Sequence, residues 1–273
     1  MLYFFCIIYE KISYSQYIIC NLNSINMGKL LYIHITTGGK MILKGRIKFI
    51  TDMIPECKIL SDIGTDHAYI PIFMVLNERC QKAIGSDIGE GPVAVANRNI
   101  KQHNVQDRVE TRLGSGLKPI SEGEMDACVI AGMGGMLIRE ILNDDLEKAK
   151  KAKALIIQPM NYIELVREWL FKNGFEIYDE GLISEGFRIY NVFAARWTGA
   201  VISNDPVYNY IGEKLIQKKD PLLKKYIARR INIIDKIIKE MSAMKDKDSL
   251  LMSEYINIRD GLLLLLQRIE KEE

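Results

Sequence analysis

The stretch SDIGTDHAYIP, from Ser61 to Pro71, decides the fold. An apolar run, CKIL, precedes it, so Asp62 and Gly64 stand at the end of a short buried strand predicted over 58–63. Helical spacing of apolar residues follows directly, over 68–77. A strand, a short acidic loop and a helix in this order are typical of the first unit of a parallel α/β sheet.

Outward from this stretch, strands and helices keep alternating. Further strands are predicted over 82–88, 108–115, 125–135 and 154–159. Further helices are predicted over 42–54, 92–104, 136–145 and 162–174, and two β-rich runs fill 175–197. Five βα units followed by a β-hairpin predict a class I methyltransferase (Rossmann-like) α/β fold, because a plain dinucleotide-binding fold would continue with another βα unit.

The last part of the chain has a different pattern. From Asp220 to Met244 apolar residues recur every three or four positions, KDKDS (245–249) interrupts them, and the pattern then continues to Ile269. Two amphipathic helices joined by a polar turn predict a C-terminal α-helical hairpin that resembles a coiled coil. We therefore expect a cofactor-binding domain over 41–198 and a helical hairpin over 199–273.

The first forty residues fit neither unit. The segment MLYFFCIIYEKISYSQYIIC is apolar but interrupted by Glu10 and Lys11, and it lacks a basic start and a small-residue cleavage site. Regular periodicity begins only at Met41. We expect Met41 to be the natural start, and residues 1–40 to be an extension that is not native or has no fixed structure.

Composition limits the location and the kind of site. Five scattered cysteines without a CxxC pair argue against a disulfide scaffold and a zinc site, and favour a reducing compartment, the cytoplasm. The sequence contains no run of 18 uninterrupted apolar residues, so we expect no membrane span. We expect no metal and no membrane partner, and the sequence leaves the oligomeric state open.

Positive charge is concentrated in one segment although the whole chain carries only +2. Between Lys214 and Lys239 nine Lys or Arg stand against two acids. This pattern fits either a solvated helix face or a surface that contacts a phosphate backbone. The candidates for nucleic-acid contact are Lys218, Lys219, Lys224, Lys225, Arg229 and Arg230.

The residues that follow each predicted strand are the candidates for a site, because ligands of open α/β sheets bind at the carboxyl ends of the strands. They are Asp62, Gly64, Asp66 and His67 after the first strand, Asp87 after the second, Gly114 and Ser115 after the third, Gly132, Met133 and Gly134 after the fourth, and Gln158 and Pro159 after the fifth.

The first loop, GTDHAY, favours a cationic cofactor. A dinucleotide needs a glycine-rich loop that lets its pyrophosphate approach the helix, and a carboxylate in that place repels phosphate. S-adenosylmethionine (SAM) carries a sulfonium and an ammonium instead, and Asp87 is placed to accept its ribose hydroxyls. The alternatives are that Asp62 caps amides of its own loop, that Asp87 is structural, and that His67 only begins a helix.

Several ordered motifs resemble the bacterial tRNA adenine-22 N1-methyltransferases. They are DIGTDHAYIP, SDIGEGPVAVA, IAGMGGMLIREIL, LIIQP, LVREWL and RIYNV, spread over about residues 41–196. The chain departs from the family at Ser115, where the family has Asp or Asn, and at Met160, where the family has Asn. The resemblance implies a SAM-dependent enzyme that acts on N1 of adenine 22 in the D-arm of tRNA.

The resemblance also implies roles for the candidate residues. The cofactor-binding set is Asp62, Gly64, Asp66, His67, Asp87, Gly91, Pro92, Gly114, Ser115, Gly132, Met133 and Gly134, and the catalytic set is Asp66, His67, Gln158 and Pro159. Asp66 is the candidate acceptor for the exocyclic amine of the target adenine, with a loop-structuring role or a cofactor contact as its alternatives. Other hypotheses stay open: a methyltransferase with another RNA, protein or small-molecule substrate, a non-catalytic RNA-binding protein on this fold, and a hairpin that serves only dimerisation.

Overall fold

The computed structural model describes residues 33–35, 41–244 and 249–271. The predicted extension over 1–40 therefore lies outside the described residues, apart from β1 (Ile33–Ile35). β1 pairs antiparallel with β2 (Met41–Leu43) in a small separate sheet. Met41 and Leu43 are buried in the core beneath the main sheet.

The main sheet has seven strands in the order β5-β4-β3-β6-β7-β9-β8. Their bounds are β3 (Cys57–Ile63), β4 (Cys80–Asp87), β5 (Val109–Leu113), β6 (Ala127–Met133), β7 (Ala154–Pro159), β8 (Phe175–Glu185) and β9 (Arg188–Trp197). β3 to β7 run parallel, and β9 and β8 complete the sheet antiparallel. The predicted methyltransferase fold is confirmed, including the switch of strand order between β3 and β6 where ligands of such sheets bind.

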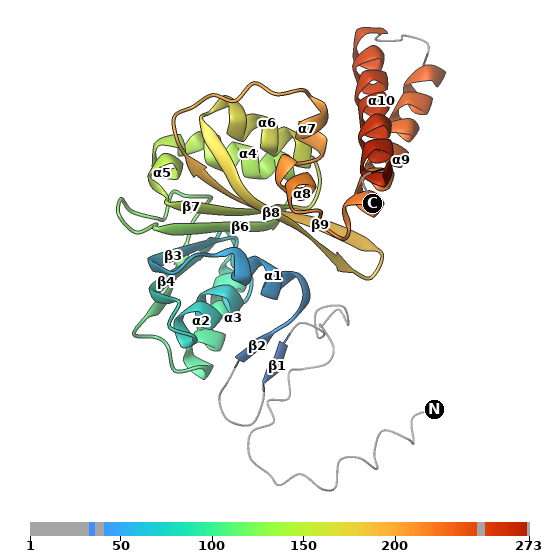
Figure 1. The fold of residues 1–273 in the computed structure, drawn as a ribbon. Helices are drawn as coiled ribbons and strands as arrows, with labels where there is room; N and C mark the ends of the chain where they lie inside the picture. Colours follow the sequence, from blue (N-terminus) through green and yellow to red (C-terminus); the bar gives the residue numbers. More distant parts are fainter. Residues whose placement is uncertain (1–32, 36–40, 245–248, 272–273) are drawn as a thin grey trace, which may run out of the picture.

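Helices cover both faces of this sheet (Figure 1). One face carries α1 (Gly45–Met53), α2 (Tyr69–Leu76) and α3 (Glu90–Gln102), and the other carries α4 (Gly135–Asp144), α5 (Leu146–Lys151) and α6 (Ile163–Lys172). All six residues of β7 are buried, as expected for a central strand covered on both faces.

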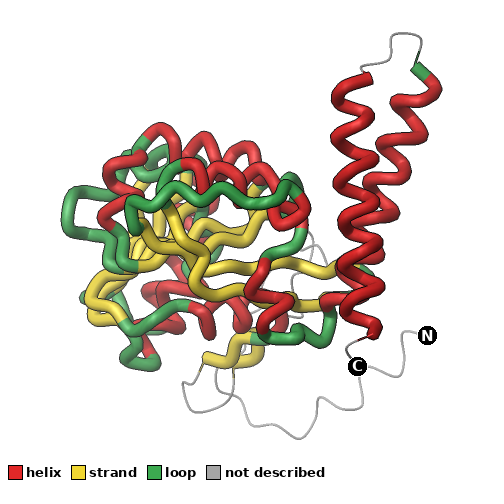
Figure 2. The backbone as a smooth tube through the Cα atoms, turned by 45° about the horizontal axis from the view of Figure 1, so that its top comes forward, coloured by secondary structure: helices red, strands yellow, loops and turns green. Residues whose placement is uncertain are grey.

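The C-terminal helical hairpin is confirmed. α9 (Leu223–Ala243) and α10 (Ser249–Lys271) pack against each other and stand out from one end of the sheet (Figure 2). The lower part of α9 joins the main core through Leu223, Tyr226 and Ile227. Two short helices that the sequence pattern did not predict, α7 (Val207–Tyr210) and α8 (Glu213–Gln217), lie between the sheet and the hairpin.

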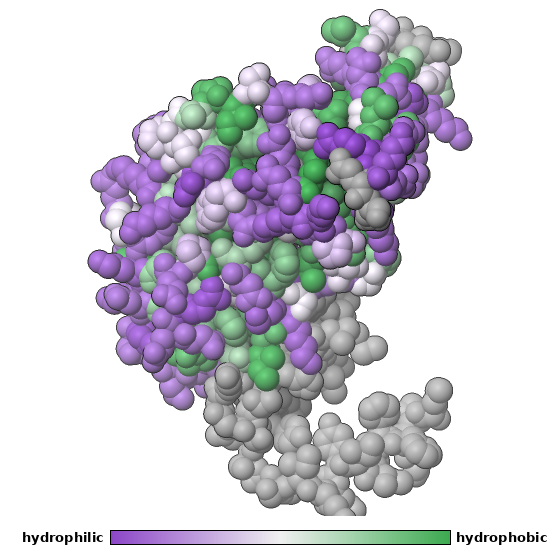
Figure 3. Space-filling model, viewed as in Figure 1, coloured by the Kyte–Doolittle hydropathy of each residue, from purple (hydrophilic) through white to green (hydrophobic). Residues whose placement is uncertain are grey.

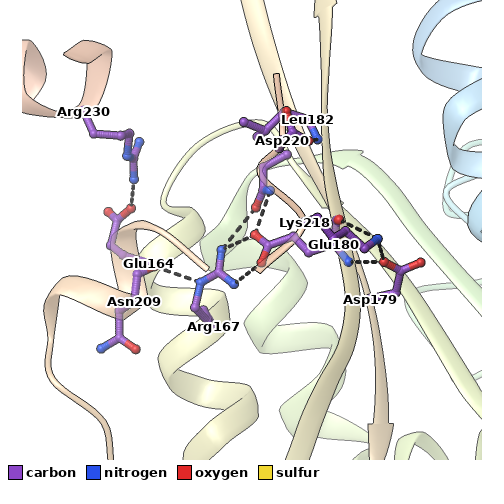
Figure 4. Close-up of polar contacts among 10 residues, drawn as sticks. Glu164, Arg167, Asp179, Glu180, Leu182, Asn209, Lys218, Asp220 and Arg230 are labelled. Atoms are coloured by element: carbon purple, nitrogen blue, oxygen red, sulfur yellow. Dashed lines mark hydrogen bonds and ion pairs between the residues drawn. The ribbon is translucent and has the colours of Figure 1, made fainter. Parts of the chain in front are cut away.

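A buried ion pair between α6 and β8 also holds the segment that carries α7 and α8 (Figure 4). Arg167 of α6 donates to both carboxylate oxygens of Glu180 in β8, at 2.7 and 3.1 Å, and neither side chain is more than 1% exposed. Asn191 donates to the same carboxylate, and Arg167 Nε donates to the main-chain oxygen of Asn209. The connecting segment is therefore fixed by charge and hydrogen bonds as well as by apolar packing.

One predicted helix was wrong at its start. We expected a helix over 42–54, but residues 41–43 form β2 and the helix begins at Gly45. Lys44 has extended backbone angles, φ −132° and ψ 167°, because the buried side chains of β2 hold this part of the chain extended. Among the described residues, no helix is long and apolar enough to cross a membrane.

Candidate active site

The first loop at the carboxyl edge of the sheet follows β3. Asp62 is the last residue but one of that strand and is only 7% exposed. Two amides of the loop, those of Gly64 and Thr65, donate to the main-chain oxygen of Ser86 in β4, at 2.7 and 2.9 Å. Because the loop's own amides are bonded to β4, the Asp62 carboxylate is not their main partner.

The environment of Asp62 is unusual for a carboxylate. Burial raises its pKa from 3.8 to about 6, the neighbouring hydroxyl of Thr65 holds the rise back, and the charge of Asp87 adds to it. Thr65 Oγ1 and Ser86 Oγ are buried and have no hydrogen-bond partner of normal geometry among the described residues. A buried acid at the end of a central strand, with the Thr65 hydroxyl beside it, indicates a place prepared for a ligand.

Asp66 and His67 lie further out on the same loop. Their side chains are 50% and 30% exposed, and His67 Nε2 lies 3.4 Å from Asp66 Oδ2. The His67 ring stacks on Tyr69, with 4.8 Å between ring centroids, and its main-chain oxygen accepts a hydrogen bond from Asn99 of α3. The loop therefore presents a partly exposed carboxylate and imidazole at the rim, in front of the buried Asp62.

Asp87 ends β4, the strand beside β3. One of its carboxylate oxygens accepts a hydrogen bond from the amide of Gly89 at 2.7 Å, so this oxygen is held within its own loop. Ile88, next to it, is 76% exposed. Gly91 and Pro92 lie in the first turn of α3, and a side chain at Gly91 would meet no atom within 4 Å, so this wall of the site is open.

The third loop lies beside the second. The amide of Gly114 donates to the main-chain oxygen of Asp87 at 2.9 Å, which joins the ends of β4 and β5. Ser115 is exposed and lines a small hollow with Gly116 and Leu137 rather than facing Asp62. Gly114 thus belongs to the wall of the site, and Ser115 lies at its edge.

The fourth loop, Gly132 to Gly134, closes over the first. A Cβ atom at Gly64 would lie 2.0 Å from Met133 Cε, so only glycine lets the Met133 side chain rest on the first loop. The Met133 carbonyl accepts a hydrogen bond from the amide of Met160, and the Gly135 amide donates to both the main-chain and the side-chain oxygen of Asn161. The loops after β6 and β7 are therefore joined into one floor.

Gln158 is completely buried at the end of β7. Its Nε2 donates to the oxygen of Pro159 at 2.9 Å, and its Oε1 accepts a hydrogen bond from Arg46 Nη1 at 2.5 Å. We predicted that Gln158 and Pro159 act directly on the reaction, but this burial argues that Gln158 instead positions Arg46.

Arg46 is a site residue that the sequence pattern did not reveal. It comes from α1, far from any strand end, and its guanidinium carbon lies 5.3 Å from the centroid of the Tyr190 ring. Its Nη1 approaches Gly132, and its Nε is buried with no hydrogen-bond partner of normal geometry among the described residues. Arg46 is one of several basic residues in ILKGRIKF, so its place at the site follows only from the packing of α1.

The six basic residues predicted to contact nucleic acid fall into two groups, those paired with acids of the protein and those that are exposed or half-buried. Arg230 is not exposed: it pairs with Glu164 of α6, and its guanidinium lies 5.6 Å from the Tyr210 ring and 5.9 Å from the Tyr226 ring. Lys218 pairs with Asp179 and donates to the main-chain oxygen of Glu180. Lys219 and Lys225 are exposed, while Lys224 and Arg229 are half-buried. Arg230 thus stabilises the base of the hairpin, and the prediction that it contacts nucleic acid is corrected.

Among the residues that the structure describes, no group of three or more His, Cys, Asp or Glu side chains is placed to hold a metal ion. The arrangement at the carboxyl edge can instead surround a cationic, hydroxyl-bearing ligand between the first two acids and the glycine loops.

Comparisons with known proteins agree with this geometry. A family model described as a methyltransferase domain matches residues 43–193. The tRNA (adenine(22)-N(1))-methyltransferase of Bacillus subtilis is 37% identical over 153 residues, which are 56% of this chain and 64% of that protein, slightly less than two thirds of its length.

Solved structures extend the likeness to most of the chain. The crystal structure of the B. subtilis m1A22 tRNA methyltransferase has a TM-score of 0.71 and 29% identity, and the match covers 84% of this chain and 98% of that one. A candidate tRNA (m1A22) methyltransferase of Streptococcus pneumoniae, crystallised with S-adenosyl-L-methionine, has a TM-score of 0.69 and 26% identity over 80% of this chain and 98% of that one.

Proposed function

Because the chain belongs to the methyltransferase-domain family, we propose that it transfers the methyl group of SAM to N1 of adenine 22 in the D-arm of tRNA. The substrate part of the proposal is supported by the likeness to m1A22 tRNA methyltransferases over most of the chain. A tRNA substrate would locate the reaction in the cytoplasm.

The single observation that carries the cofactor assignment is the buried acid of the first loop. Asp62 is buried at the end of β3 and has a raised pKa, and the Thr65 hydroxyl lies beside it. A cationic ammonium fits such a carboxylate, whereas a phosphate would be repelled. The described residues therefore fit SAM, which supplies an electrophilic methyl group on its sulfonium when bound.

Each loop at the carboxyl ends of the strands contributes proposed contacts to the cofactor. Asp62 holds the cationic end of the cofactor, and the second oxygen of Asp87 accepts its ribose hydroxyls. The proposed remaining contacts come from loop backbone and from small or flexible side chains: Gly64, His67, Gly91, Pro92, Gly114, Ser115, Gly132, Met133 and Gly134. Residues 41–198 form the proposed cofactor-binding domain, and residues 199–273 form the proposed tRNA-binding part.

The chemistry requires little of the protein beyond alignment and proton handling. N1 of adenine has an in-plane lone pair that attacks the methyl carbon once base and methyl group are aligned. Positive charge then develops on the base, and a carboxylate near the exocyclic amine stabilises it by accepting a hydrogen bond or a proton. Asp66, the half-exposed carboxylate at the rim, is the proposed acceptor, with His67 beside it. Pro159, at the end of β7, is a further proposed catalytic residue.

The test is incubation of the protein with methyl-labelled SAM and unmodified tRNA, followed by nucleoside analysis. We expect label in 1-methyladenosine, and its loss when adenine 22 of the tRNA transcript is replaced by guanine. The Asp66→Ala variant should bind SAM within a few-fold of the wild type and form no 1-methyladenosine. Label in another nucleoside would overturn the proposed target, and a large loss of SAM affinity would reassign Asp66 to the cofactor.

A further inference from the structure

The β8–β9 hairpin ends in an exposed aromatic side chain that the fold does not need. Glu185 and Arg188 pair across the ladder, so the turn consists of Gly186 and Phe187 alone. Gly186 has φ +57°, as the first central residue of a type II′ turn requires. Phe187 is 78% exposed, and a side chain added at Gly186 would meet nothing within 4 Å. The tip therefore stands clear of the rest of the described protein.

The tip projects beyond the carboxyl edge of the sheet. Phe193 of β9 pairs with Ile157, two residues before the end of β7. Continuing this register places Asn191 opposite Pro159, the last residue of β7. Arg188, the first residue of β9, is three residues further along, which at roughly 3.4 Å per residue is about 10 Å beyond the end of β7. Figure 1 shows the hairpin extending past the other strands, toward the side on which α9 and α10 stand. The proposed active site lies at this same edge.

Two arginine–aromatic pairs line the hairpin. The Arg188 guanidinium carbon lies 5.6 Å from the Phe187 ring centroid, and the Arg46 guanidinium carbon lies 5.3 Å from the Tyr190 ring centroid. Arg188 and Tyr190 alternate along β9 and so share one face. Gln158 holds Arg46 by a hydrogen bond, and the carboxylate of Glu185 accepts the Arg46 main-chain N–H. We call Phe187, Arg188, Tyr190 and Arg46 the arginine–aromatic strip.

The strip has the chemistry that unpaired RNA recognises. Unstacked bases stack on aromatic rings and guanidinium planes, and arginines pair with phosphate oxygens. N1 lies on the base-pairing edge of adenine, so the target base must leave its pair and its stack before it can react. The nucleotides beside it then need a surface that replaces the lost stacking.

We propose that the arginine–aromatic strip binds the tRNA strand next to the target adenine, with a neighbouring base stacked on Phe187 and phosphates paired with Arg188 and Arg46. This inference rests on the proposed function, because it takes the carboxyl edge of the sheet as the place where the base reacts. Glu185 is the carboxylate of the hairpin tip, and its bond to the Arg46 amide orients it toward the backbone rather than toward the RNA.

The experiment compares Phe187→Ala, Phe187→Trp and Leu264→Ala with the wild type. Leu264 is 67% exposed on α10, outside the strip and not among the basic residues between 218 and 239 proposed to contact tRNA, and it serves as the matched control. We measure KM and kcat for an unmodified tRNA transcript, the Kd for that transcript, the Kd for SAM, and the melting temperature. Phe187→Ala should raise KM and Kd for tRNA roughly tenfold and leave the SAM affinity and the melting temperature unchanged.

Phe187→Trp should restore tRNA binding, because the larger ring keeps the stacking face, and Leu264→Ala should behave as the wild type. Arg188→Ala should lower the slope of log Kd against log salt concentration by about one. If the wild type forms 1-methyladenosine and Phe187→Ala binds tRNA as tightly, the strip proposal is wrong and the proposed function stands. If the wild type forms none, the proposed function fails, and the direct binding measurement still decides whether Phe187 contacts RNA.

Discussion

At the scale of the residue, burial determines what Asp62 can do. Its pKa of about 6 lies far above the 3.8 of a carboxyl in water, chiefly because the charged form loses its hydration. Above pH 6 the free protein therefore holds a desolvated charge that destabilises the fold. A bound cation would remove this penalty, which makes the same burial a source of cofactor affinity.

The first prediction concerns the pH dependence of stability. The folded-state pKa of Asp62 is raised, so its stabilising contribution is complete below about pH 4 and is lost as the pH rises through about 6. Asp62→Asn removes the charge, and the free energy of unfolding at pH 8 should rise by about 1–3 kcal/mol while the gain vanishes near pH 4. The measurement is urea unfolding of wild type and variant across this range.

The same variant should weaken SAM binding at pH 8 by roughly tenfold or more, or about 1.4 kcal/mol. Asp107→Asn is the matched control, since the Asp107 side chain is 77% exposed and pairs only loosely with Arg108 at 4.0 Å. A variant that is both less stable and unchanged in SAM affinity would contradict the assigned role of Asp62.

Sequence reasoning located one part of the site and could not locate another. The loops after β3, β4 and β6 could be predicted to meet, because parallel strands end at a common edge. Arg46 could not be predicted, because its neighbours Gln158 and Tyr190 are more than a hundred residues away in the sequence and are joined to it only by tertiary packing. The burial of Arg230 was missed for the same reason: its partner Glu164 lies on α6.

At the scale of the element, the periodicity of apolar residues predicted the long helices and strands, but it did not predict the shortest elements. The five parallel strands and the antiparallel pair follow from the alternation of strand and helix patterns, and the structure confirms them. The short strand β2 and the short helices α7 and α8 have five residues or fewer, too few for a periodicity to appear. Packing against the sheet, rather than local propensity, determines these pieces.

The second prediction concerns Gly212, the residue just before α8, which lies against the buried ion pair of Arg167 and Glu180. A Cβ atom there would lie 1.7 Å from Glu180 Oε2 and 2.5 Å from Arg167 Nη1. Gly212→Ala must therefore displace a buried charged pair, and removing one partner of such a pair costs about 3–5 kcal/mol. We expect a loss of about 3 kcal/mol in the free energy of unfolding, measured from denaturant midpoints.

The control for this substitution is Gly91→Ala, where the new methyl group meets nothing within 4 Å and the helix gains up to about 1 kcal/mol of propensity. Equal stability of Gly212→Ala and the wild type would mean that α8 shifts freely, and the segment between sheet and hairpin would then not be fixed by Arg167 and Glu180.

At the scale of the whole molecule, the hairpin is both a part of the core and a separate surface. Its apolar residues Ile231, Ile234, Leu262 and Leu265 belong to the same cluster as the main sheet. In Figure 3 hydrophilic residues cover much of its visible surface, with apolar side chains among them. Deletion of the hairpin would therefore expose the core, and changes of surface charge are the better test of its role.

The last prediction uses the basic side of α9. Lys225, Lys236 and Lys239 are exposed and, together with Arg229, follow one another at spacings of three, four or seven residues, so they share one face of the helix. Arg229 is half-buried, and the three lysines are the ones to reverse. A face of this kind that binds the tRNA backbone should do so mainly through phosphates and weaken as salt rises.

Replacing the three lysines by glutamate should raise KM for tRNA more than tenfold and reduce the salt slope of binding by about one for each lysine that pairs with a phosphate in the wild type. SAM affinity and thermal stability should stay unchanged, because these side chains lie outside the core and away from the loops after β3 and β4. Lys58→Glu is the control, because Lys58 lies at the amino end of β3, away from the carboxyl ends of the strands. If the triple variant binds tRNA normally but changes its mass in solution, the hairpin serves assembly instead, and tRNA must be held by the carboxyl edge of the sheet alone.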